Sequence, residues 1–123
     1  MARPFVKMNG LGNDFVVVQP GVTPFEPSAA EVRAIADRNR GVGCDQLIAL
    51  EPSTQADARM RIWNADGGEV QACGNAARCV GWLLMQASGH DHASIETATG
   101  ILQARRAGDA VEVDMGPPGL RWT

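Results

Sequence analysis

Hydrophobic and polar residues alternate along several short stretches of the chain, and this pattern predicts strands. In residues 59–64, for example, Met60 and Ile62 share one face while two arginines share the other. A period of two is expected of a strand with one buried face. Alternation, β-branched content and flanking turn residues predict strands over residues 5–8, 14–19, 46–50, 59–64, 69–72, 94–99, 101–106 and 110–115.

Two further stretches have the spacing of helices. Ser28 and Glu31 form a capping box at the start of the first helix, and Gly41 is expected to end it in the left-handed conformation. The second helix, residues 75–87, contains no proline and a single charge, Arg78, so apolar side chains surround it. A helix that is apolar on all sides is typically buried. We therefore predict an α+β fold in which a sheet curls around the second helix.

Length and charge restrict the classes of function. The 123 residues support one domain, because domains commonly have about 100–150 residues. The formal net charge is −3 and the pI is near 5.2, which argues against a nucleic-acid partner. No apolar run approaches the roughly 18 residues that span a bilayer, and the start of the chain lacks the apolar stretch of a signal peptide. We therefore expect no membrane partner.

Cysteine, histidine and glycine usage restricts the cofactors. Three cysteines without a secretory signal predict reduced thiols and a cytoplasmic location. The only histidines are His90 and His92, and no Cys-x-x-Cys pair is present, so no metal site is expected. The glycine pairs in residues 10–12 and 41–43 lack the third glycine of a dinucleotide fingerprint. We expect no bound cofactor.

Cys73 is the first candidate for chemistry. It directly precedes the predicted apolar helix, in the order Cys73, Gly74, Asn75. The positive end of a helix favours a thiolate and lowers the pKa of a cysteine there. Gly74 allows an anion to approach the backbone closely, and Asn75 can cap or hydrogen-bond it. The site would suit a carboxylate, but a buried, inert cysteine explains the same position.

Three amide side chains form a second set of candidates. Asn13, Gln46 and Asn64 each stand at the predicted end of a strand or at a turn. A turn role is sufficient to explain each of them separately. If the fold brought them together with Cys73, they would form a polar ring suited to a small zwitterion.

Four motifs, read in order, resemble the diaminopimelate epimerase family. They are residues 7–15 (KMNGLGNDF), 41–46 (GVGCDQ), 61–67 (RIWNADG) and 73–79 (CGNAARC), and the similarity continues to Gly116. One departure is Ala76, where the family usually has a second glycine. Alanine forms helix more readily, so we expect a stiffer helix start and little chemical change.

The resemblance implies a fold and a reaction. The fold is a mixed, mostly antiparallel sheet curled as a barrel around a central apolar helix, one of two pseudo-symmetric halves. The reaction is cofactor-independent epimerisation of LL-diaminopimelate to the meso form by two cysteines that act as base and acid on opposite faces. By the match, Cys73 is one of these cysteines. The substrate-binding residues implied by the match are Gly74, Asn75, Asn13, Gln46 and Asn64.

The resemblance also implies that a second half completes the enzyme. Family chains are roughly twice as long, and the second catalytic cysteine belongs to the C-terminal half, which is the expected partner. We expect residues 1–116 to form the N-terminal domain and residues 117–123 to begin the interdomain linker. Apolar surface left open without the other half, including Trp122, favours self-association, so a homodimer is one expected assembly.

Two alternatives stay open from the sequence. One is a related racemase or isomerase on the same fold, of the proline racemase or phenazine-biosynthesis type. The cysteine at position 73 argues against relatives that use a carboxylate base, and the asparagine pattern favours diaminopimelate over proline. The other is a module that binds a small amino acid without turnover, and a second Cys-Gly-Thr motif downstream would distinguish it from an enzyme.

Overall fold

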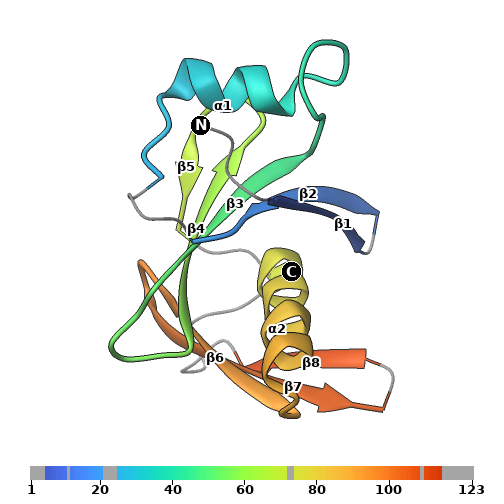
Figure 1. Cartoon of the computed structure of the whole chain (residues 1–123), viewed down its shortest axis with the longest axis vertical. Coiled ribbons are helices and arrows are strands. Elements are labelled where there is room, and N and C mark those ends of the chain that lie inside the picture. Colours follow the sequence, from blue (N-terminus) through green and yellow to red (C-terminus); the bar gives the residue numbers. More distant parts are fainter. Residues whose placement is uncertain (1–4, 11, 21–24, 72–73, 109, 115–123) are drawn as a thin grey trace.

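A single sheet of eight strands and two helices make up the described part of the chain (Figure 1). The computed structural model describes residues 5–10, 12–20, 25–71, 74–108 and 110–114. The strands are β1 (Phe5–Gly10), β2 (Asn13–Val18), β3 (Gln46–Glu51), β4 (Ala58–Asn64), β5 (Glu69–Val70), β6 (His92–Thr97), β7 (Gly100–Ala107) and β8 (Ala110–Asp114). The helices are α1 (Ala29–Ala36) and α2 (Gly74–Ser88). The expected number and order of elements are confirmed.

The sheet is mixed and curled. Its strand order is β1-β2-β3-β4-β6-β7-β8, with β5 paired to β4. β2 is parallel to β3 and β4 is parallel to β6, while the other pairs are antiparallel. Helix α2 packs against β6, β7 and β8 and also against β1 and β2, so the sheet bends around it (Figure 1). The predicted α+β fold, with a mostly antiparallel sheet curled around a central helix, is confirmed.

Two apolar clusters cover the two faces of the β2–β4 region. Phe15 and Val17 belong to the cluster around α2, whereas Val16 and Val18 belong to the cluster beneath α1. Successive side chains of a strand point to opposite faces, so a strand covered on both sides is apolar throughout. This burial on both faces explains the uninterrupted apolar run of β2, and it fixes which strand positions face α2.

The first helix begins as predicted but ends earlier. The Ser28 hydroxyl accepts a 3.1 Å hydrogen bond from the Glu31 amide, and the Glu31 carboxylate accepts a 2.8 Å bond from the Ser28 amide. The prediction that Gly41 ends the helix in the left-handed conformation is wrong, because α1 ends at Ala36. Gly41 instead allows the chain to fold back on the helix, since a Cβ there would overlap the Ala34 carbonyl oxygen.

The second helix is covered on only part of its circumference. It ends before Gly89, whose φ of +78° confirms the predicted helix stop. The prediction that it is buried on all sides is wrong, because Trp82 is 47% exposed. On the covered side, β7 approaches so closely that a Cβ added at Gly81 would lie 2.6 Å from the Cβ of Ala104. The curled sheet therefore surrounds the helix incompletely.

Several predicted boundaries shift by one or two residues. β6 lies two residues earlier than predicted, because Ala98 and Thr99 form the turn to β7. The predicted strand ends at Ala72 and Met115 and the linker 117–123 lie outside the described residues. The domain boundary at residue 116 therefore stays a prediction. Neither helix of the described part is long and apolar enough to cross a membrane.

Candidate active site

Two of the predicted site residues are hydrogen-bonded to each other across neighbouring strands. Gln46 is the first residue of β3 and Asn64 is the last residue of β4, and the antiparallel register pairs them. The side-chain amide of Gln46 donates a 3.0 Å bond from Nε2 to Asn64 Oδ1. Gln46 Oε1 is buried and has no hydrogen-bond partner among the described residues. A buried acceptor without a partner costs free energy, so this oxygen is available to a ligand donor.

Asn13 lies on the same face of the sheet. The parallel register pairs Phe15 of β2 with Gln46 of β3, and Asn13 precedes Phe15 by two residues. Paired residues and residues two apart share a face. Phe15 is packed in the cluster around α2, so this face is the one that α2 covers. The three predicted amides therefore occupy neighbouring strand ends on the α2 side of the sheet.

The start of α2 completes the described part of the candidate site. Gly74 is its first residue and is buried, and Asn75 follows, half-buried. The N-terminal, yellow end of α2 lies toward β1 and β2 (Figure 1), which the helix contacts. The first turn of a helix has amide hydrogens without partners in the helix and attracts anions. Asn75 Oδ1 accepts a 2.9 Å bond from the Arg78 guanidinium, so its side chain is held by the helix itself.

Cys73, the predicted catalytic residue, lies outside the described residues. Its assignment therefore rests on its place in the sequence, directly before Gly74. Its role as acid or base stays a prediction.

The two described cysteines have structural surroundings. Cys44 is buried in the cluster beneath α1, on the face of the sheet away from α2. Burial raises the pKa of the Cys44 thiol above its ordinary value, which favours the neutral form. Cys79 is buried in the cluster around α2, which confirms the prediction that it packs in the core. Burial and its effect on the thiol argue against reactivity at Cys44, and burial alone argues against it at Cys79.

Two residues to which the sequence assigned no function lie beside the amides. Asp14 directly follows Asn13, and Asp45 directly precedes Gln46. The Asp14 amide donates a 2.8 Å bond to Asp45 Oδ2, which connects the two strand starts. The sequence signal was available, because each carboxylate adjoins a predicted site amide. The motifs did not show that the two carboxylates meet.

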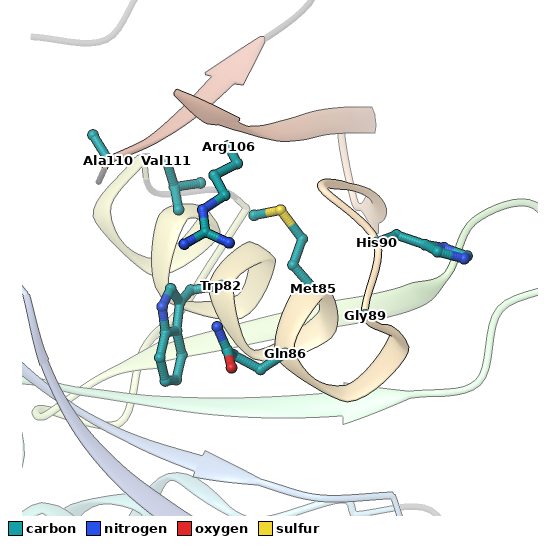
Figure 2. A pocket seen from close by; sticks show the side chains of 8 residues that line it. All are labelled: Trp82, Met85, Gln86, Gly89, His90, Arg106, Ala110 and Val111. Atoms are coloured by element: carbon teal, nitrogen blue, oxygen red, sulfur yellow. The ribbon is translucent and has the colours of Figure 1, made fainter. Parts of the chain in front are cut away.

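A separate hollow lies at the other half of α2. It measures about 190 Å³ and is lined by residues that include Trp82, Met85, Arg106 and Val111. Figure 2 shows the indole of Trp82 and the Arg106 guanidinium on its wall. None of the predicted site residues in the described part lines it. No group of three or more metal-ligating side chains occurs among the described residues either.

Comparison with known proteins identifies the family. A family model described as diaminopimelate epimerase matches residues 5–120. The chain belongs to the diaminopimelate epimerase family. The match includes every predicted site residue, Cys73 among them. The family membership, which the four sequence motifs indicated, is therefore confirmed.

Curated relatives agree with this membership and are longer. A diaminopimelate epimerase from Phenylobacterium zucineum is 68% identical over 99% of this chain and 44% of its own length. One from Caulobacter vibrioides is 52% identical over 100% of this chain and 46% of its own length. The chain thus spans about half the length of the diaminopimelate epimerases it matches.

Solved structures share the fold at low sequence identity. A probable proline racemase from Agrobacterium radiobacter has a TM-score of 0.67 and 19% identity, covering 90% of this chain and 41% of that one. A predicted epimerase from Pseudomonas aeruginosa has a TM-score of 0.64 and 22% identity, covering 94% of this chain and 43% of that one. These likenesses confirm the fold that diaminopimelate epimerases were expected to share with racemases.

Proposed function

We propose that this chain is the N-terminal half of an epimerase that interconverts LL- and meso-diaminopimelate without a cofactor. The observation that carries the proposal is the Gln46–Asn64 amide pair, in which Gln46 Oε1 is buried and has no hydrogen-bond partner in the described part of the chain. A donor of a zwitterionic substrate would satisfy that oxygen. Family membership and the names of the relatives support diaminopimelate as the substrate.

The substrate would lie between the sheet and the start of α2. Its reacting α-carboxylate or amino group is assigned to Gly74 and Asn75, where the helix start favours an anion. Asn13, Gln46 and Asn64 would contact the remainder of the molecule, including its distal end. Contacts at both ends of the substrate would hold its α-carbon in a fixed position relative to Cys73. Such positioning lowers the entropic part of the activation barrier for proton transfer.

The reaction would be a proton exchange between two thiols through one carbon. One cysteine, as thiolate, removes the α-proton from one face and becomes a thiol. The other, as thiol, delivers its proton to the opposite face and becomes a thiolate. Cys73 is one of the pair, and the second belongs to the C-terminal half. Amide donors and a helix N-terminus at the carboxylate would stabilise the negative charge that develops as the C–H bond breaks.

This function includes three further proposals about the cell and the assembly. The product, meso-diaminopimelate, would serve lysine and peptidoglycan precursor synthesis. Reduced catalytic thiols require a reducing compartment, which favours the cytoplasm. A homodimer is proposed as one assembly.

The test is conversion of LL-diaminopimelate to the meso form by the complete enzyme, meaning this chain joined to its C-terminal half. Chiral chromatography with mass detection measures the product, and L-proline and trans-4-hydroxy-L-proline serve as comparison substrates. We expect conversion of diaminopimelate alone. The 123-residue chain without its other half should give no conversion, because only one thiol would be present at the site. Turnover of proline instead would favour the racemase alternative, and binding without turnover would favour the binding module.

A further inference from the structure

Arg38 forms ion pairs with two carboxylates whose residues adjoin the predicted site amides in sequence. It lies in the segment between α1 and β3, and Nη1 is 2.7 Å from Asp14 Oδ2 while Nη2 is 3.1 Å from Asp45 Oδ1. A guanidinium presents its donors in a rigid plane, so two acceptors are held in fixed directions. The single positive charge of Arg38 therefore offsets part of the negative charge of two neighbouring carboxylates, and its two nitrogens hold them side by side.

Asp45 connects this ion-pair cluster to two other segments of backbone, at Asp14 and at Ala65. Its Oδ2 accepts a 2.8 Å bond from the Asp14 amide, and its own amide donates a 3.0 Å bond to the Asp14 carbonyl. Its carbonyl accepts a 3.2 Å bond from the Ala65 amide. Asp14, Asp45 and Ala65 each adjoin one of the predicted site amides in sequence. The bonds of Asp45 thus link the backbone segments that carry the three amides.

Two neighbouring residues, Gly43 and Asn9, suit the position of Arg38 between the carboxylates. Gly43 has a φ of +84°, and a Cβ there would lie 3.1 Å from Arg38 Cγ, so a larger residue would press on the arginine. Asn9 Nδ2 donates a 3.0 Å bond to Asp14 Oδ1, the oxygen that Arg38 leaves open. Both carboxylate oxygens of Asp14 therefore have partners, which fixes the strand start that carries Asn13.

Arg38 acts from the far side of the sheet. Asp14 lies in β2, and adjacent residues of a strand point to opposite faces, so its side chain faces away from the side that carries Asn13. The Asp45 carboxylate meets the same guanidinium as Asp14. We propose that Arg38 is a positioning residue, which sets the geometry of Asn13, Gln46 and Asn64 through Asp14 and Asp45 without touching substrate. This inference rests on the proposed function. The Arg38 side chain is 53% exposed, and exposed ion pairs contribute little to stability, so its effect should appear in substrate use.

The test compares Arg38→Gln with Arg105→Gln in the complete enzyme. Arg105 is a matched control, because it forms an exposed 3.1 Å ion pair with Glu112 on the β7–β8 hairpin, away from the candidate site. Kinetics with LL-diaminopimelate should show kcat/KM lowered about 10- to 100-fold by Arg38→Gln, mainly through KM, because small misplacements of contact groups have effects of that size. Arg38→Lys should lie between, because an ammonium lacks the fork that spans both carboxylates. Arg105→Gln should match the unsubstituted enzyme.

Hydrogen–deuterium exchange separates this inference from the proposed function. Arg38→Gln should speed exchange in peptides covering residues 12–16, 44–48 and 64–68, and Arg105→Gln should not. Equal kinetics for the two variants would overturn the positioning role, and so would a kinetic loss without faster exchange. If Arg38→Gln does not fold, the same comparison is made with Arg38→Lys. An unsubstituted enzyme without epimerase activity would overturn the proposed function, while the exchange pattern would still decide whether Arg38 orders these segments.

Discussion

The side chains of Gln46 and Asn64 are joined by a 3.0 Å hydrogen bond from Gln46 Nε2 to Asn64 Oδ1. The Gln46 Oε1 atom is buried and has no hydrogen-bond partner among the described residues. Such a pair orients an acceptor before any ligand arrives. The arrangement is costly in the absence of a ligand donor and favourable in its presence. It is therefore the feature of the fold that most directly suggests a binding site.

The first prediction tests that acceptor. Gln46→Ala in the complete enzyme should raise KM for LL-diaminopimelate about 10-fold or more, since a hydrogen bond to a charged group contributes about 1.5–3 kcal/mol. Steady-state kinetics measures the effect. Gln103→Ala, at an exposed position of β7, is the control and should leave KM unchanged. An unchanged KM in Gln46→Ala would remove Gln46 from the site.

The second prediction concerns thiol reactivity and pH. In the complete enzyme, iodoacetamide should modify Cys73 faster than Cys44 or Cys79, because a helix start favours the thiolate while both other thiols are buried. The pKa of Cys44 is raised by burial, so Cys44 stays neutral at pH values where an ordinary cysteine ionises. Its modification rate should therefore increase at higher pH in the folded protein than in guanidinium.

Peptide mass mapping from pH 7 upward measures these three rates. Unfolding in guanidinium is the control, and it should bring the rates at the three positions close together. Native modification of Cys44 at a rate equal to that of Cys73 would contradict the assignment of reactivity.

The third prediction tests the contact between α2 and the sheet. Gly81→Ala should destabilise the protein by about 1–3 kcal/mol, the usual cost of overpacking, because the new Cβ would lie 2.6 Å from Ala104 Cβ. Thermal unfolding of the complete enzyme measures the loss. Adding Ala104→Gly to the variant removes the clashing atom, so the double variant should be more stable than Gly81→Ala alone. A double variant that is less stable than the single one would contradict this account of the contact.

Local signals in the sequence were sufficient for most of the fold. The capping box at Ser28 and Glu31 and the glycine after α2 depend on neighbouring residues only, and the structure contains both. The end of α1 could not be predicted in this way. Gly41 is needed because the chain folds back on the helix, which is a contact between distant parts of the backbone.

The pattern of apolar residues also could not predict the exposure of Trp82 or the contact between Asp14 and Asp45. An apolar residue at position 82 predicts burial, but the curled sheet does not reach that side of α2, so Trp82 stays half exposed. The parallel pairing of β2 with β3 brings Asp14 and Asp45 together. The sequence pattern does not predict this contact, because the two residues are far apart in sequence. The sequence motifs were sufficient to select the three amides. Arg38, Asp14 and Asp45 were recognised as a cluster beside them only from the tertiary structure.

Exchange of the substrate α-proton with solvent shows whether Cys73 acts as an acid or base at this site. The complete enzyme is incubated with diaminopimelate in deuterated water, and incorporation at the α-carbon is followed by mass spectrometry. Cys73→Ala should slow exchange at least about 100-fold, as expected for loss of a general acid–base group, while Cys44→Ala should leave it near the unsubstituted rate. Exchange at the full rate in Cys73→Ala would rule out an acid or base role for Cys73.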